Sequence, residues 1–199
     1  PAIRKLLHER KITAAGIGPG LTIAPAVAVA LQSLLPALAG IPLVLDADGL
    51  NCLAGITNNP LRGRSSPAVL TPHPGEAARL LKTSTAAIQA DRGAAAALIA
   101  RKFKAVCLLK GHETLVSDGK KASLNRTGNP GMAKGGMGDV LTGLIAGFLA
   151  QGLSPFDAAR LGAYVHGSAG DLAAKELGEA AMLPRDLAAA LPKAMKRLE

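Results

Sequence analysis

The chain has 199 residues, a length that fits one domain with a substantial core. Hydrophobic residues make up 49% of it, but aromatic residues only 2%, and Trp is absent, so the core must consist mainly of aliphatic side chains. Such a core suits a parallel sheet covered by helices. The net charge of +9 favours small polyanions as ligands. Because Lys and Arg are dispersed and residues for base stacking are scarce, we expect no nucleic-acid partner.

Targeting signals and cysteines are also informative. No apolar run free of charge and proline reaches the ~20 residues that cross a bilayer, and no leader-like segment opens the chain. We therefore expect no membrane partner. Cys52 and Cys107 lack the spacing of a metal or redox motif and are expected to be reduced thiols. Together these features predict a cytoplasmic protein.

In chain order, the first half alternates short apolar strands with Ala-rich helices. A first helix is expected over residues 1–11. Strands are then predicted at 12–17, 42–47, 68–71 and 105–109, and helices at 24–38, 77–81 and 85–103. This alternation indicates βαβ units and a mostly parallel sheet. The Asp118-Gly119 pair between apolar segments at 114–117 and 121–124 predicts an antiparallel hairpin at the sheet edge. Three further helices are expected at 140–151, 155–175 and 184–198.

Polar, glycine-bearing segments follow the predicted parallel strands. They span residues 16–21, 46–51, 71–76 and 110–114. Since the carboxyl ends of parallel strands lie side by side, we expect these segments to converge on one ligand crevice. Asp46 and Asp48 either line this crevice or form an Asx turn, and for Asp48 we favour the turn. His166 and Tyr164 lie in an Ala- and Gly-rich helical stretch, where core packing is expected.

The most informative segment places three glycines around one carboxylate. Gly135, Gly136 and Gly138 surround Asp139, directly before an apolar run at 140–149. A glycine-rich turn that opens a helix directs free N–H groups and the positive end of the helix dipole at one point, which suits a phosphate. A carboxylate there would repel the anion unless it takes a proton from an attacking hydroxyl. This pattern indicates phosphoryl transfer to an alcohol, with Asp139 as the base. The alternative is a tight loop in which Asp139 caps the helix.

Two other strand-end segments carry candidate ligand-binding residues. His73 stands between two prolines, and Glu76 falls in the first turn of the next helix, where it either complements the dipole or holds a hydrated Mg²⁺. Lys110 can pair with a nucleotide phosphate while Gly111 leaves room for a ring, although an ordinary strand-exit lysine fits equally well. The glycines at 16–20 do not match the dinucleotide fingerprint, and a plain tight turn is favoured there.

Taken together, five motifs resemble those of the ADP/ATP-dependent NAD(P)H-hydrate dehydratase family, which is carbohydrate-kinase-like. They occur in family order: Gly-Pro-Gly-Leu at 18–21, Asp-Ala-Asp-Gly-Leu-Asn at 46–51, Thr-Pro-His-Pro-Gly-Glu at 71–76, Leu-Lys-Gly-x-x-Thr-Leu-Val at 109–116, and Asn-x-Thr-Gly-Asn-Pro-Gly-Met-Ala-x-Gly-Gly-Met-Gly-Asp-Val-Leu-Thr-Gly at 125–143. The resemblance implies a ribokinase-like, three-layer α/β/α fold. It also implies repair of hydrated NADH and NADPH, in which ADP or ATP phosphorylates the hydroxyl on C6 of the damaged ring and phosphate then leaves.

The resemblance further implies a role for each matching residue. Asp139 would deprotonate the C6 hydroxyl, and the anion hole would be formed by Gly135, Gly136, Met137 and Gly138. The nucleotide would be bound by Lys110, Gly111, His112, Glu113, Thr114 and Gly138. The hydrated dinucleotide would contact Gly18, Gly20, His73 and Asp139. Mg²⁺ would bridge phosphates with Glu76 nearby, held directly or through water.

The resemblance also bears on the extent of the domain and on its partners. Family domains begin with further strand–helix units, so the chain is expected to be a single domain over 1–199 that is shortened at its amino end. A homo-oligomer and a partnership with a hydrate epimerase are expected. Two alternatives stay open: a kinase of small alcohols such as vitamin precursors, and a catalytically incomplete nucleotide-binding fragment.

Overall fold

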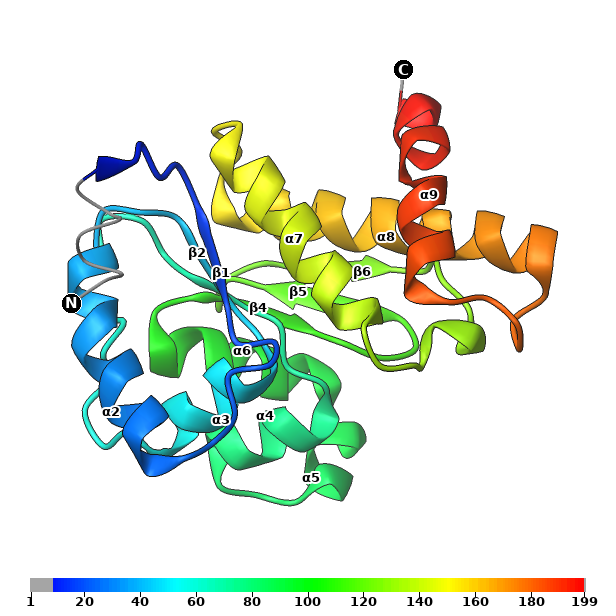
Figure 1. The fold of residues 1–199 in the computed structure, drawn as a ribbon. Coiled ribbons are helices and arrows are strands. Elements are labelled where there is room, and N and C mark those ends of the chain that lie inside the picture. The colour runs from blue at the N-terminus through cyan, green and yellow to red at the C-terminus, as the bar shows by residue number, and fades with distance from the viewer. Residues whose placement is uncertain (1–8, 199) are drawn as a thin grey trace.

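A computed structural model describes residues 9–198 of the chain (Figure 1). The helix expected over 1–11 lies almost entirely outside these residues. One sheet contains β1 (Ala15–Ile17), β2 (Leu43–Leu45), β3 (Val69–Leu70), β4 (Val106–Leu109), β5 (Thr114–Ser117) and β6 (Ala122–Asn125), in this spatial order. Strands β1 to β4 run parallel, whereas β4–β5 and β5–β6 pair antiparallel. The predicted mostly parallel sheet with an antiparallel edge hairpin is therefore confirmed.

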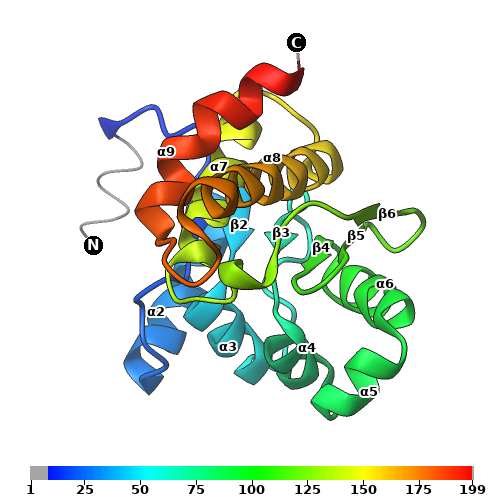
Figure 2. The same cartoon turned by 90° about the vertical axis from the view of Figure 1, so that its right-hand side faces the viewer.

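Helices cover both faces of this sheet, which gives the expected three layers (Figures 1 and 2). One layer contains α2 (Pro25–Leu34), α3 (Ala47–Gly55), α4 (Pro74–Leu81), α5 (Thr85–Ala90) and α6 (Arg92–Phe103). The opposite layer contains α7 (Met137–Ala150), α8 (Pro155–Leu177) and α9 (Pro184–Met195). Short 3₁₀ turns lie at η1 (Leu35–Leu38), η2 (Pro130–Met132) and η3 (Lys196–Leu198). No helix in the described part of the chain is both long and apolar enough to cross a membrane.

Two hydrophobic cores lie on either side of the sheet, because successive side chains of a strand point to opposite faces. In β2, Leu43 and Leu45 belong to the core beneath α2 to α6, whereas Val44 belongs to the core beneath α7 to α9. All three side chains are fully buried. Burial on both faces explains why the parallel strands read as uninterrupted apolar runs.

Several element boundaries differ from the sequence-based expectation, and two of the differences have a clear local cause. The single helix expected over 85–103 is divided at Asp91, whose carboxylate accepts a hydrogen bond from the Ala94 N–H (2.8 Å) and thereby starts α6. The polar tip expected at 46–51 is the beginning of α3. Asp48 therefore lies in a first helical turn, where it accepts a hydrogen bond from the Thr22 N–H (2.8 Å), and the expected Asx turn was wrong.

The turn after β1 depends on a glycine that has no room for a side chain. Gly18 has a φ of 138°, and a Cβ at this position would lie 1.7 Å from the Asp46 carbonyl oxygen. Gly20 also has a positive φ, of 73°, but no heavy atom of the described residues would lie within 4 Å of its Cβ. The chain after β1 therefore packs against the start of α3 only because residue 18 is glycine.

We expect Gly18→Ala to lower the free energy of unfolding by about 3 kcal/mol, because strain and a backbone clash act together. Gly20→Ala, the matched control, should cost about 1 kcal/mol through strain alone. Urea denaturation of both variants measures the difference. Equal losses would contradict the close packing of β1 against α3.

Candidate active site

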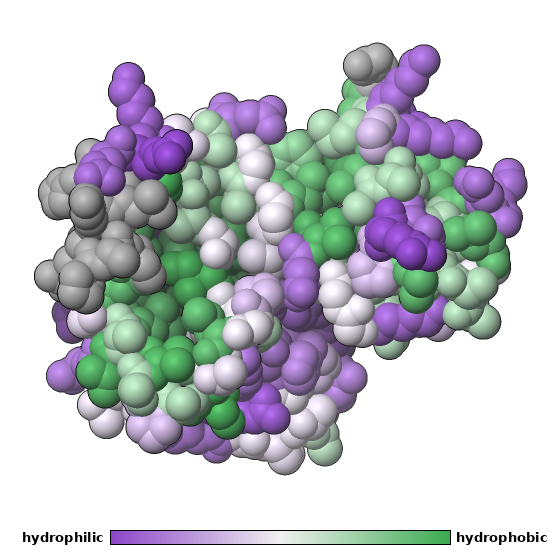
Figure 3. Space-filling view, in the orientation of Figure 1, coloured by the Kyte–Doolittle hydropathy of each residue, from purple (hydrophilic) through white to green (hydrophobic). Residues whose placement is uncertain are grey.

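A cavity of about 580 Å³ opens at the carboxyl ends of the strands, between the hairpin and the helices α7 and α8. Its walls come from segments far apart in the sequence: 73–74 at the start of α4, 110–114 after β4, 125–134 after β6, the first turns of α7, and α8 around His166. In Figure 3, hydrophilic residues gather below the N-terminal end of α7. This is the crevice position expected for an open α/β sheet.

All six residues predicted to bind nucleotide line this cavity together. They are Lys110, Gly111, His112, Glu113, Thr114 and Gly138, and His73 joins them from α4. Gly18, Gly20, Gly135, Gly136, Asp139 and Glu76 are outside the lining. The structure therefore brings the 71–76 and 110–114 segments to one cavity, whereas the 16–21 and 46–51 segments lie behind or beside it.

The glycine-rich turn opens a helix, as predicted. Gly136 is the N-cap of α7 with a φ of 86°, and α7 begins at Met137, three residues earlier than expected. Val140 N–H bonds to the Gly136 carbonyl (3.3 Å), but within residues 9–198 the N–H groups of Gly138 and Asp139 form no hydrogen bond. Unpaired N–H groups in a first helical turn are suited to an anion.

Asp139 lies in this first turn and is exposed. Among residues 9–198, no hydrogen bond or ion pair involves its carboxylate, which distinguishes it from the other first-turn acids, such as Asp157 and Asp186, that bond within their helix caps. The simple capping role that the sequence left open for Asp139 is therefore not observed. Its carboxylate is available to a ligand beside the free N–H groups.

Beneath Gly138 lies a buried ion pair. Lys110 Nζ donates to Asp46 Oδ1 (2.7 Å), and the Thr142 hydroxyl donates to Asp46 Oδ2 (3.0 Å). Asp46 is only 1% exposed. A Cβ on Gly138 would lie 3.3 Å from Asp46 Oδ2 and 3.4 Å from Lys110 Nζ, so a side chain there would press on the pair. Together with Thr142, the pair links the residues that directly follow β2 and β4 to α7, below the proposed phosphate position.

Sequence reasoning missed much of this network. It allowed two roles for Asp46, lining the crevice or forming an Asx turn, and it assigned no role to Thr142. The only signal was the position of Asp46 at a strand end. Nothing in the local sequence links it to Thr142, which is 96 residues away.

His73 and Glu76 form a reciprocal cap at the start of α4. His73 Nδ1 accepts hydrogen bonds from the N–H groups of Gly75 (3.0 Å) and Glu76 (3.4 Å), and Glu76 accepts one from the His73 N–H (2.8 Å). The Glu76 carboxylate also lies 3.8 Å from Lys110 Nζ. The His73 side chain stays 51% exposed at the cavity, so its Nε2 edge can reach a ligand. Glu76 therefore serves as the helix-capping acid, one of the two roles expected for it.

His166 contacts the site from α8. Its Nε2 lies 2.9 Å from the Met137 carbonyl, in the first turn of α7, and the ring lines the cavity as well as packing in the core. Burial lowers its pKa from 6.5 to about 4; the bond to Met137 opposes this shift and the charge of Lys110 adds to it. Tyr164, by contrast, is 40% exposed, so the expectation that it packs in the core was wrong.

The segment after β6 is fastened to α8. The Asp171 carboxylate accepts hydrogen bonds from the Gly128 N–H (2.9 Å) and from Asn129 Nδ2 (3.0 Å). Thr127 Oγ1 donates to the Tyr164 carbonyl (3.0 Å), and it lies so close to α8 that a Cβ on Gly167 would be 2.2 Å from it. These bonds hold the 125–132 wall of the cavity in place. No local sequence signal marks Asp171 for this role.

The three layers, the sheet order and a glycine-rich turn that opens a helix beside the cavity are those of the ribokinase-like class. The chain belongs to the NAD(P)H-hydrate dehydratase family, whose model matches residues 2–193. The resemblance inferred from the five motifs is thereby confirmed.

Named relatives agree with this assignment. The chain is 53% identical to the bifunctional NAD(P)H-hydrate repair enzyme of Moorella thermoacetica, over 92% of this chain and 34% of that one. It is 45% identical to the ADP-dependent (S)-NAD(P)H-hydrate dehydratase of Neisseria meningitidis, over 89% and 61%. The structure of the Bacillus subtilis ADP/ATP-dependent NAD(P)H-hydrate dehydratase, co-crystallised with ATP/Mg²⁺, matches with a TM-score of 0.84 at 36% identity, over 94% and 65%. The chain thus spans about a third to three-fifths of the length of the two curated relatives.

We expect Asp46→Asn to lower the free energy of unfolding by about 3 kcal/mol, because it removes the charge that pairs with Lys110 in a buried position. The matched control is Glu113→Gln, which breaks the exposed ion pair with Arg126 and should cost no more than about 0.5 kcal/mol. Urea denaturation at neutral pH measures both. A loss in Asp46→Asn as small as that of the control would contradict a structural role for the buried pair.

We also expect stability to depend on pH through His166. Its folded pKa of about 4 lies below the ordinary 6.5, so the unfolded state binds more protons between these values and stability falls as pH drops from 6.5 toward 4. The full effect is about 3 kcal/mol, which His166→Gln should remove from the pH profile of unfolding. The exposed His112, changed to Gln, is the control. An unchanged profile for His166→Gln would contradict burial of the neutral ring.

Proposed function

We propose that the chain dehydrates the S-epimer of hydrated NADH and NADPH at the expense of ADP or ATP. The oxygen of the C6 hydroxyl attacks the terminal phosphorus of the nucleotide, its proton passes to a base, and AMP leaves when ADP is the donor. The C6–O bond then breaks as phosphate departs, and loss of a proton from C5 re-forms the double bond. The products are NADH or NADPH, AMP and phosphate.

One observation carries this proposal: an exposed carboxylate with no partner among residues 9–198 stands at the start of α7, next to the cavity, beside N–H groups that are also unpaired within this range. Asp139 is the proposed base, since its carboxylate lies in the first turn of α7 beside these N–H groups and can accept a proton from an attacking hydroxyl. The N–H groups of residues 135–138 would stabilise the charge that develops on the transferred phosphoryl group. Membership of the family and the names of the relatives support the same chemistry.

The cavity is the proposed nucleotide site. Its volume of about 580 Å³ is ordinary for a small-molecule pocket, and its walls combine apolar side chains with cations. Met132 and Leu141 offer surface for the base, while Lys110 and the segment to Thr114 would hold ribose and phosphates. The preference between ADP and ATP stays open in this proposal.

The hydrated dinucleotide would approach from the side of the cavity where His73 and Gly20 are exposed. His73 has its Nδ1 occupied by the α4 cap, and its Nε2, which lies 3.4 Å from Glu76 Oε1, is the ring nitrogen left for substrate. Gly20 has open space above its backbone, which allows close approach of a bulky ligand. Gly18 is buried, and its proposed contact is by backbone only.

Mg²⁺ bound with the nucleotide would offset the phosphate charges. Among residues 9–198 no group of three or more His, Cys, Asp or Glu side chains could hold a metal ion, and Mg²⁺ generally binds through substrate phosphates, waters and one or two carboxylates. Glu76 is the nearby candidate. Because its carboxylate already accepts the His73 N–H and lies near Lys110, the arrangement fits a contact through water.

Partners and location complete the proposal. The proposal includes a partnership with a hydrate epimerase, because several relatives are named as bifunctional repair enzymes. Self-association into a homo-oligomer stays a prediction. We place the activity in the cytoplasm, where a protein with two free, buried cysteines meets no oxidising conditions.

Asp139→Asn tests the proposed function directly. The intact chain should restore the dihydropyridine absorbance of hydrated NADH with Mg²⁺ and ADP or ATP, and the variant should be about 10²- to 10⁴-fold slower because it lacks the base. Asp157→Asn, which changes a first-turn acid of α8 outside the cavity, should keep full activity. Failure of the wild type to restore absorbance with either nucleotide would refute the dehydratase activity. Equal rates for Asp139→Asn and the wild type would refute the role of Asp139.

A further inference from the structure

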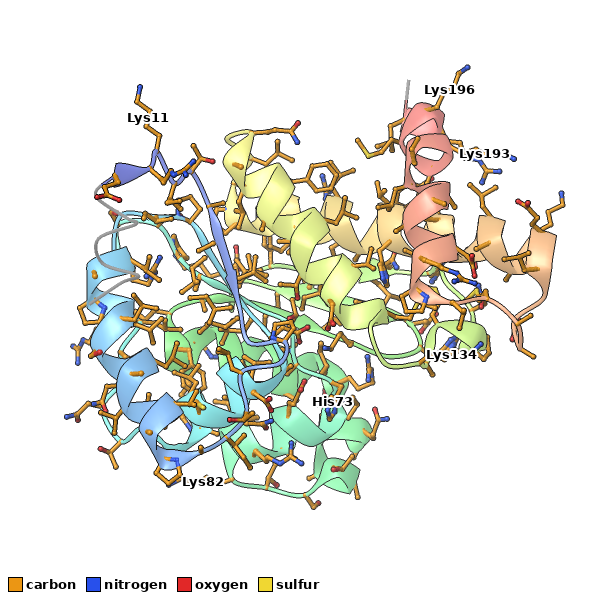
Figure 4. The ribbon with its side chains drawn as sticks, in the orientation of Figure 1. Lys11, His73, Lys82, Lys134, Lys193 and Lys196 are labelled. Carbon is orange, nitrogen blue, oxygen red and sulfur yellow. The ribbon has the colours of Figure 1, made fainter. Side chains whose placement is uncertain are left out.

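The loop that joins α8 to α9, residues 178–183, lies against the glycine-rich segment that precedes α7. Figure 4 shows Lys134 on the yellow-green segment, beside the orange loop after α8. Neither the sequence motifs nor the proposed chemistry assigns a role to this contact. It fastens the segment that would bind the phosphoryl group to a distant part of the chain.

Lys134 makes the central contact. Its Nζ donates to three backbone carbonyls of the loop: Glu179 (2.9 Å), Ala180 (2.7 Å) and Met182 (2.9 Å). A lysine ammonium has three N–H donors, so every one of them is used. Hydrogen bonds to a charged group are roughly twice as strong as neutral ones, which makes this the strongest link between the two segments.

Close packing on either side of Lys134 leaves the loop little freedom. A Cβ on Gly131 would lie 2.5 Å from the Glu179 carbonyl oxygen, and one on Gly136 would lie 2.9 Å from Pro184 Cγ. The loop backbone therefore touches the segment before the lysine, and the ring of Pro184, the first residue of α9, touches it after the lysine. Met182, which supplies one of the carbonyls, is fully buried. This side of the glycine-rich segment is held by protein contacts at three successive points.

The charges explain why a lysine is suited to this position. The Glu179 and Ala180 carbonyls come directly after the C-terminus of α8, where the helix dipole is negative. Lys134 also stands just before α7, whose positive end would be unfavourable for a cation without such partners. Once those carbonyls hold the ammonium, its charge adds to the attraction of the α7 N-terminus for an anion.

The opposite side of the same segment is open. Gly135 is exposed, with no heavy atom within 4 Å of the place a Cβ would occupy, and the N–H groups of Gly138 and Asp139 form no hydrogen bond within residues 9–198. One side of the segment is thus anchored and the other is exposed. The anchor determines the direction in which the free N–H groups point.

We propose that Lys134 is a positioning residue. The three hydrogen bonds from its ammonium to the loop carbonyls hold residues 135–138 in their anion-binding conformation. Its effect on turnover rests on the function proposed above, whereas its effect on the backbone and on anion binding does not. Lys134 contacts no reacting atom in this proposal and acts through the backbone of the glycine-rich segment.

The first test compares Lys134→Met with Lys193→Met, which changes an exposed lysine in the last turn of α9 (Figure 4). Hydrogen–deuterium exchange of the amides at 135–138 and 179–182 should speed up at least about tenfold in Lys134→Met, and the affinity for pyrophosphate, used as the anion probe, should fall about tenfold. Turnover should fall about 10- to 100-fold through kcat, because the anion donors are displaced. Lys193→Met should match the wild type in all three measurements.

The second test is chemical rescue of Lys134→Ala. Removal of the side chain leaves three carbonyls without a donor, and ethylammonium can supply the missing N–H groups. We expect ethylammonium to raise both the pyrophosphate affinity and the kcat of Lys134→Ala at least about fivefold above their values without the amine. Tetramethylammonium carries the same charge without N–H donors and should restore neither.

The outcomes separate this inference from the function on which it partly rests. Unchanged exchange and pyrophosphate affinity in Lys134→Met would overturn it whether or not the chain repairs hydrated NADH. Faster exchange with unchanged affinity and kcat would overturn it as well, since Lys134 would then serve stability alone. If the wild type lacks repair activity, exchange, pyrophosphate affinity and rescue of that affinity still decide the question.

Discussion

The buried ion pair between Lys110 and Asp46 is the interaction on which the geometry of the site depends. A buried pair is tolerated only where further hydrogen bonds satisfy its remaining groups, and Thr142 provides one for Asp46. Lys110 and Asp46 stand directly after β4 and β2, and Thr142 belongs to α7. The pair therefore fixes the start of α7 over the carboxyl ends of the parallel strands, and Gly138 is small enough to lie directly above it.

The rest of the site divides into groups that are held and groups that are free. Lys134 donates to backbone carbonyls of the loop between α8 and α9, and His166 bonds to the Met137 carbonyl in the first turn of α7. Asp171 bonds to the wall formed after β6. Asp139 and the N–H of Gly138 form no such bonds within the described residues. Such an arrangement preorganises donors toward a transition state without using them in the fold, which is the main physical requirement for stabilising a transferred phosphoryl group.

Much of the fold could be predicted because local patterns decide it. The uninterrupted apolar run of β2, the Asp-Gly hairpin and the glycine turn before α7 each follow from a few neighbouring residues. The errors also have local causes. Asp91 divides a long helical stretch because its side chain caps a new helix, and Tyr164 is exposed because it lies on the side of α8 away from the core.

The sequence by itself determined the class of fold, the family and the candidate base, since the motifs around Asp139 and His73 are continuous in the chain. Only the tertiary structure decided what supports them. Lys110 and Asp46 are 64 residues apart, and Lys134 lies 48 residues from Met182. Contacts over such separations depend on how strands and helices pack against one another. A linear pattern of residue types carries no record of that packing, so the supporting network emerged only in three dimensions.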